Sequence, residues 1–146
     1  MKTELIETNV ETVKEFLAKT HSWGLPDLEV IDRTVDPQIV CHGFAGGNPD
    51  DRESYKNWFR TFRKSFSEMD FRIARMVADH EHVAVQWTVA VTHSGEFAGL
   101  PATGRRVEFD GMVFYRLENG RIAETWLSID MQPALSQIGA VSHPLA

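Results

Sequence analysis

The dipeptide Asn119-Gly120 separates two runs in which apolar and polar residues alternate. This combination is the strongest short-range signal for a β-hairpin, and it predicts a two-residue type I′ turn. Once Glu118 is paired with Arg121, the other partners on the same face follow by counting. They are Leu117 with Ile122, Tyr115 with Glu124, Val113 with Trp126, Gly111 with Ser128, and Phe109 with Asp130.

Asp130 is the residue of this predicted hairpin that most needs an explanation. A carboxylate has little structural use in a stretch that is otherwise typical of a half-buried strand, so Asp130 is the first candidate for chemistry. Asp110 falls on the opposite face of a regular hairpin, and only a β-bulge could bring both carboxylates to one side. The structural alternative is a strand-end aspartate that caps the following turn or pairs with a surface arginine.

Composition narrows the class of protein. With 146 residues, 42% of them hydrophobic and 25% charged, the chain is expected to form a single domain over residues 1–146. A net charge of −6 makes nucleic acid an unexpected partner, and the cluster Arg60, Arg63 and Lys64 is interpreted as the solvated side of a helix. No apolar run has the length of a membrane span or a signal peptide, and Cys41 is the only cysteine. We therefore expect a soluble, cytoplasmic protein without a disulfide or a membrane contact.

The remaining patterns predict an α+β order. A helix follows the capping-box pattern at Thr8 and ends before Trp23, a short one begins at Asp27, and Asp36-Pro37 stops it. A third helix opens near Asp50 and carries an aromatic stripe, of which Trp58 and Phe62 could form a pocket roof. Strands are expected over residues 38–44, 70–78 and 83–93 and on both sides of the hairpin turn.

Three segments carry a more specific pattern. They are residues 83–89 (VAVQWTV), residues 92–104 (THSGEFAGLPATG) and residues 120–126 (GRIAETW), with Asp130 four residues beyond the last. This pattern resembles the SnoaL-like polyketide cyclases of the nuclear transport factor 2-like superfamily. The resemblance implies a cone in which a curved, mostly antiparallel sheet wraps three helices of the N-terminal half around a pocket. Because such cones host several reactions and also proteins without catalysis, the fold alone does not name the reaction.

The resemblance also implies roles for individual residues. Asp130 matches the acid/base aspartate of the cyclases, and its face of the hairpin would look into the pocket. The residues expected to bind substrate are then Trp58, Phe62, Gln86, Phe109, Gly111, Val113, Trp126 and Ser128. Such an apolar lining disfavours the charged form of a carboxylate, so we predict that the pKa of Asp130 is raised. A carboxylate with a raised pKa is suited to taking a proton from the carbon beside a carbonyl. Gln86 and Thr88 stand where the limonene epoxide hydrolase branch has its Arg-x-Asp pair, which disfavours epoxide hydrolysis.

His42 is the second catalytic candidate, since it ends the first predicted strand where related pockets often place a polar partner. Its imidazole could hydrogen-bond an enolate oxygen while Asp130 takes the carbon-bound proton. The alternative is a satisfied buried histidine or an exposed one at a strand end. A thiolate couple with Cys41 is not expected because consecutive strand residues face opposite ways, and Ser128 lacks a nucleophile elbow.

No metal or other cofactor is expected. His80 and His82 share a short turn without an evident third ligand. The sequence thus predicts a cofactor-independent cyclase, isomerase or lyase that acts on a small apolar carbonyl compound. Large apolar residues on both faces of the sheet predict a homodimer. The alternative is a non-catalytic protein of the same fold, either a small-molecule binder or a dimerising association module.

Overall fold

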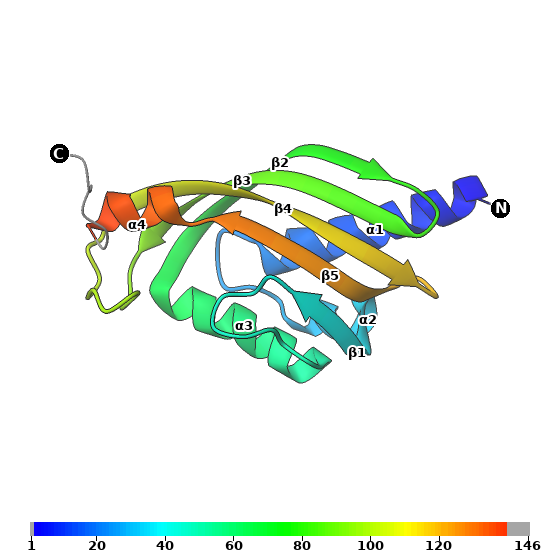
Figure 1. The fold of residues 1–146 in the computed structure, drawn as a ribbon, viewed down its shortest axis with the longest axis horizontal. Helices are drawn as coiled ribbons and strands as arrows, with labels where there is room; N and C mark the ends of the chain where they lie inside the picture. Colours follow the sequence, from blue (N-terminus) through cyan, green and yellow to red (C-terminus); the bar gives the residue numbers. More distant parts are fainter. Residues whose placement is uncertain (1, 140–146) are drawn as a thin grey trace.

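The computed structural model describes residues 2–139 of the chain. Its elements, in chain order, are α1 (Lys2–Thr20), α2 (Glu29–Thr34), β1 (Val35–His42), α3 (Arg52–Ser65), β2 (Phe66–Ala78), β3 (His82–His93), β4 (Arg106–Glu118), β5 (Arg121–Asp130) and α4 (Gln132–Ile138). The strands form one open sheet in the order β1-β5-β4-β3-β2, in which only β1 and β5 are parallel. Figure 1 shows the long strands curving around α1 and α3. The predicted α+β cone is confirmed.

Several element boundaries differ from the sequence-based expectation. α1 begins at Lys2, earlier than the Thr8 capping pattern indicates. Asp36 and Pro37 lie inside β1 instead of ending α2, which is possible because β1 is an edge strand and a proline there need not interrupt the ladder. The cap of α3 is Asp51, which forms a capping box with Ser54. α4 was not predicted at all.

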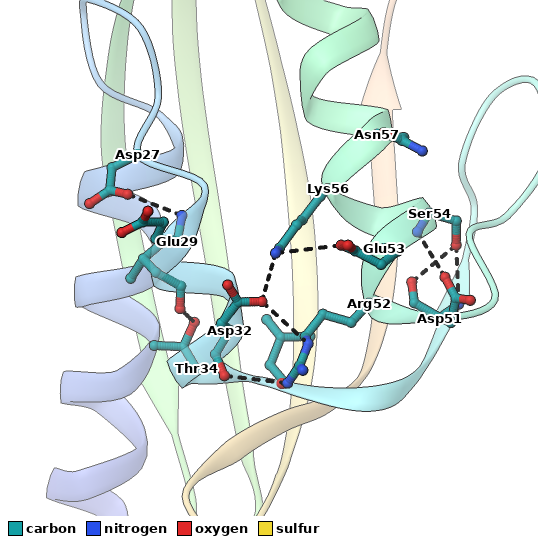
Figure 2. A network of polar contacts seen from close by, with 12 residues as sticks. Asp27, Glu29, Asp32, Thr34, Asp51, Arg52, Glu53, Ser54, Lys56 and Asn57 are labelled. Atoms are coloured by element: carbon teal, nitrogen blue, oxygen red, sulfur yellow. Dashed lines mark hydrogen bonds and ion pairs between the residues drawn. The ribbon is translucent and has the colours of Figure 1, made fainter.

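A polar network fixes the start of α3 against α2, as Figure 2 shows. Lys56 Nζ lies 2.6 Å from Asp32 Oδ1, and Arg52 Nη1 donates to the carbonyl of Val35 at 3.2 Å. The hydrogen bond from Lys56 is the main reason why the pKa of Asp32 is lowered. Because α3 carries the aromatic stripe, this network positions those rings over the sheet.

The hairpin contains a bulge that changes which side chains face inward. Asn119 and Gly120 have φ values of 52° and 76°, as a type I′ turn requires, and Glu118 pairs with Arg121 as predicted. After Leu117 and Ile122 the register shifts by one residue at Ala123, so the predicted partners beyond that point are wrong. The observed pairs are Arg116 with Glu124, Tyr115 with Thr125, Val113 with Leu127, Gly111 with Ile129, and Asp110 with Asp130.

The core lies on the concave face of the sheet. Alternate residues of β3 from Val83 to His93 are buried there, and so are the alternate residues of β4 from Val107 to Leu117 except for half-buried Gly111. Trp87 belongs to this core, and a Cβ atom on Gly111 would lie only 2.5 Å from its indole ring. Glycine at position 111 therefore makes room for the tryptophan. Within residues 2–139, no helix combines the length and apolar content that crossing a bilayer requires.

Candidate functional site

A cavity lies between the concave face of the sheet, the end of α1 and the aromatic face of α3. Its walls are mostly apolar and include four residues expected from the sequence, namely Trp58, Phe62, Phe109 and Val113. The volume is about 50 Å³, enough for a few water molecules at about 10–15 Å³ each. Trp58, Phe62 and Ile129 also border a second recess of about 250 Å³ beside Phe97. These three side chains line both spaces, so a ligand larger than the cavity would require them to move.

Four of the expected substrate-binding residues do not reach this cavity. Gly111 faces inward but lies against Trp87, away from the cavity wall. Gln86, Trp126 and Ser128 have side chains on the outer face of the sheet, where Gln86 accepts a hydrogen bond from Arg75 at 3.1 Å. The positions predicted for Trp126 and Ser128 are wrong because the bulge at Ala123 turns every later residue of β5 to the opposite face.

Asp130 is likewise exposed on the outer face, directly opposite Asp110. Its Oδ1 accepts a hydrogen bond of 3.3 Å from the backbone N–H of Gln132 at the start of α4. The expected pocket position of Asp130 is therefore wrong, and the argument that apolar surroundings tune this carboxylate loses its basis. The contact that the structure shows is the one expected of a strand-end aspartate next to a turn.

His42 also lies on the outer face. Its ring stacks on Trp126 with centroids 5.3 Å apart, and its Nε2 is 2.7 Å from Glu124 Oε2. Hydrogen bonds from His42 and then from Arg116 lower the pKa of Glu124. Cys41 points to the core, where burial raises its pKa to about 12. Both predicted catalytic residues thus stand outside the cavity, and Cys41 and His42 face opposite ways as expected.

His21 lines the cavity, although the sequence did not single it out. The Thr20 hydroxyl donates its only proton to the carbonyl of Phe16 at 2.7 Å, so toward His21 it can act only as an acceptor. This places the imidazole proton on Nδ1, which is 2.7 Å from that hydroxyl, and leaves a free lone pair on Nε2. Burial, followed by the positive charge of Arg63, lowers the pKa of His21 to about 3. The ring is therefore neutral near pH 7.

Arg63 brings a positive charge to the same wall. The sequence placed it on a solvated helix side, but its side chain borders the cavity. Its Nη2 donates to the carbonyl oxygens of Ser22 at 2.5 Å and Thr20 at 3.4 Å, and no carboxylate within residues 2–139 pairs with it. Burial lowers its pKa, yet a guanidinium remains charged at neutral pH. An uncompensated cation at an apolar wall favours a ligand group that carries or develops negative charge.

Three hydroxyl groups form a second polar region of the cavity, which we call the hydroxyl cluster: Tyr55, Tyr115 and Thr125. Thr125 is fully buried, pairs with Tyr115 in the ladder, and has no hydrogen-bond partner for its Oγ1. Neither tyrosine hydroxyl forms a hydrogen bond with residues 2–139. Burial raises the pKa of both tyrosines, that of Tyr55 further because Tyr115 and Cys41 are close. All three groups are uncharged.

Some of these positions left a signal in the sequence. Thr20 continues the helical stripe of buried residues Val13, Phe16 and Leu17 in α1, and a polar residue in such a stripe points to a buried hydrogen bond. His21 follows directly. No comparable signal marks Thr125, because its inward position depends on the bulge. Within residues 2–139, no group of three His, Cys, Asp or Glu side chains is arranged to hold a metal ion.

The chain was compared with known families and structures. The family model described as SnoaL-like polyketide cyclase matches residues 11–138. AclR, described as a putative hydroxylase from Streptomyces galilaeus, is 26% identical with a TM-score of 0.81 over 96% of this chain and 87% of that chain. Wild-type IdmH, described as a putative polyketide cyclase from Streptomyces antibioticus, is 29% identical with a TM-score of 0.76 over 90% and 98%. No curated protein is matched.

A third structure supports the fold alone. It is described as a putative SnoaL-like polyketide cyclase from Jannaschia sp. CCS1, and it is 20% identical with a TM-score of 0.81. The match covers 94% of this chain and 96% of that chain. Together with the family match, these similarities confirm the resemblance seen in residues 83–126.

Proposed function

The chain belongs to the SnoaL-like polyketide cyclase family, and we propose that it catalyses a cofactor-independent ring closure or isomerisation of an apolar carbonyl compound in the cavity. One observation carries the proposal. Neutral His21, whose Nε2 is the unprotonated ring nitrogen, and the unpaired cation of Arg63 line one apolar cavity. A proton acceptor beside a cation is the arrangement that enolate formation needs.

The proposed reaction begins with proton transfer. His21 Nε2 takes a proton from the carbon next to the substrate carbonyl, the electrons of that C–H bond form a C=C bond, and the carbonyl π electrons move onto the oxygen. Arg63 would face the resulting enolate oxygen. A base whose pKa is about 3 is weak in the free protein, but the enolate charge raises its proton affinity as the proton arrives. Apolar walls strengthen both interactions because they exclude water.

The next step depends on the substrate. For ring closure, the enolate carbon attacks a second carbonyl of the same molecule, a C–C bond forms, and the alkoxide takes the proton back from His21. For isomerisation, the imidazolium returns the proton to another carbon. In both cases Arg63 is held ready by the carbonyl groups of Ser22 and Thr20, so little reorganisation is needed.

A test that does not depend on the natural substrate is hydrogen–deuterium exchange next to a carbonyl. α-Tetralone, a bicyclic aryl ketone, is incubated with the full chain in D₂O, and loss of the α-proton signal is followed by NMR. General-base catalysis contributes about 10²–10⁴-fold, so His21→Gln is expected to slow exchange by about 100-fold or more, and Arg63→Met substantially. His42→Gln, on the outer face, is the matched control and should exchange like the parent.

The same assay separates the alternatives. Equal rates for the parent and His21→Gln would refute the proposed base. Tight binding of the ketone without exchange would favour a non-catalytic binding protein. The acid/base role of Asp130 stays a prediction that now lacks support from burial. Loss of exchange in Asp130→Asn would restore that role, whereas unchanged exchange would leave Asp130 as an acceptor for the backbone N–H of Gln132.

We also propose that the protein acts as a homodimer formed through the outer face of the sheet. Large apolar side chains gather there on neighbouring strands, with exposed fractions of 46% for Val40, 56% for Met112, 51% for Phe114 and 38% for Trp126. Phe114 and Trp126 are direct cross-strand partners. An apolar patch of this kind is typical of a protein interface, and a second copy of the chain offers a matching surface.

A further inference from the structure

We propose that the hydroxyl cluster of Tyr55, Tyr115 and Thr125 is a recognition site for an uncharged oxygen of the substrate, a ketone or phenol group, remote from the reacting carbon. This inference rests on the proposed function, because it concerns the same cavity, and it adds the chemical class of the group bound at the end away from Arg63. The substrate would then carry oxygen atoms at both ends.

The first argument is the state of Thr125. Its side chain is fully buried and its Oγ1 has no partner within residues 2–139. A buried hydroxyl without a hydrogen bond is unfavourable for folding, and valine would fill the same volume without that cost. A threonine in this place is explained if the hydroxyl binds a ligand. The hydroxyl can serve either as donor or as acceptor.

The second argument is the character of the neighbouring groups. Tyr55 and Tyr115 are both 3% exposed, and each ring packs against Phe16, with centroids 6.0 and 5.9 Å away. Their hydroxyl groups remain protonated because burial raises the pKa of each. They therefore offer hydrogen bonds but no positive charge. A ketone or phenol suits such surroundings, whereas a carboxylate would be desolvated there without a counterion.

The third argument is the spacing of the two polar regions. Tyr55 and Arg63 both belong to α3, and their backbones are about 12 Å apart at 1.5 Å rise per residue. Phe59 lies between them on the cavity wall, with its ring 5.1 Å from that of Tyr55 and 5.7 Å from that of His21. A flat substrate lying against Phe59 could reach the hydroxyl cluster at one end and His21 at the other.

The test compares two probes that differ by one hydroxyl group, 2-naphthol and naphthalene, in equilibrium binding to the full chain. A hydrogen bond of ordinary strength corresponds to about threefold to tenfold in affinity. We expect the parent to prefer 2-naphthol by about tenfold or more. Thr125→Val and Tyr115→Phe should each remove most of this preference and leave naphthalene binding unchanged, whereas His21→Gln should retain it.

Several outcomes would overturn the proposal. The first is that the preference for 2-naphthol over naphthalene persists in both Thr125→Val and Tyr115→Phe. The second is that this preference disappears in His21→Gln, and the third is that the parent does not bind 2-naphthol measurably. Thermal melting provides the folding control, since Thr125→Val should melt at or above the parent temperature because the lost hydroxyl has no partner. A failed exchange test with His21→Gln would instead refute the proposed base and leave this binding result standing.

Discussion

At the residue scale, the state of His21 is decided by its neighbours. Thr20 directs its hydroxyl proton to Phe16, which leaves the Nδ1 proton of His21 as the donor and Nε2 as the acceptor. Burial and Arg63 together keep the ring neutral. Its role thus follows from two hydrogen bonds and one nearby charge. The same reasoning separates His21 from His42, whose ring is half-exposed on the outer face and pairs with Glu124.

The first prediction concerns the pH dependence of catalysis. The profile of kcat/KM reports the free enzyme, in which His21 has a pKa of about 3 and must be neutral to accept a proton. We therefore expect kcat/KM for hydrogen–deuterium exchange of α-tetralone to be constant from pH 8 down to about pH 5. A histidine of ordinary pKa, about 6.5, would lower kcat/KM by about fivefold between pH 6.5 and 5.5, and that result would contradict the assignment.

The second prediction concerns stability in acid. The pKa of His21 falls from 6.5 in the unfolded chain to about 3 in the folded one, so the unfolded chain binds more protons between these values. Stability is therefore complete above about pH 6.5 and decreases as the pH falls, by at most about 1.4 kcal/mol per unit. Urea unfolding at pH 7 and pH 5 should show that His21→Gln loses about 1–2 kcal/mol less than the parent. An identical loss in both proteins would argue against a buried neutral His21.

At the element scale, the bulge in β5 decides what the cavity contains. One extra residue, Ala123, turns Thr125, Leu127 and Ile129 inward and leaves Glu124, Ser128 and Asp130 outside. In a hairpin without the bulge, Thr125, Leu127 and Ile129 would face outward, and Glu124, Ser128 and Asp130 would face inward. The position of Thr125 in the hydroxyl cluster and the exposure of Asp130 therefore have the same cause.

The third prediction follows from this exchange of faces. Deletion of Ala123 would either turn Glu124, Ser128 and Asp130 toward the core or break the ladder. Unpartnered buried polar groups cost about 1–3 kcal/mol each, so the deletion should lower the free energy of unfolding by about 3 kcal/mol or more. Deletion of Gly47, which has open space around it in the loop after β1, is the matched control. Denaturation followed by circular dichroism measures both, and parent-like stability of the Ala123 deletion would disprove the role of the bulge.

At the scale of the whole molecule, the two faces of the sheet have separate uses. The concave face holds the core and the cavity, and the convex face carries the exposed patch around Phe114 and Trp126. Because side chains alternate along a strand, the residues that make the proposed dimer are not those that bind the substrate. Changes to the outer patch should therefore affect assembly more than catalysis.

The fourth prediction tests this assembly. Phe114→Glu places a charge in the centre of the patch and should convert a dimer to a monomer of 16.6 kDa in sedimentation velocity. Leu25→Glu is the matched control, since Leu25 is 94% exposed in the loop between α1 and α2, off the sheet. The parent sedimenting as a monomer would contradict the proposed homodimer. If the parent and Phe114→Glu both sediment as dimers, the dimer interface lies elsewhere on the molecule.

The sequence by itself determined the features that depend on neighbouring residues. Asn119-Gly120 predicted the turn and the first two pairs of the hairpin, and the aromatic stripe predicted α3 together with Trp58 and Phe62 at the cavity. The α+β order and the family resemblance were also confirmed. These features rest on local turn geometry and on periodicity, which a single chain displays in its residue order.

Only the tertiary structure decided which side chains share the cavity. A β-bulge is a property of two paired strands, so no counting along β5 could place Asp130 outside and Thr125 inside. His21 directly follows α1 and Arg63 lies in α3, so their proximity arises from the packing of these two helices against the sheet. Burial and electrostatic effects act through space between residues far apart in the chain, which is why the candidate site emerged only from the folded molecule.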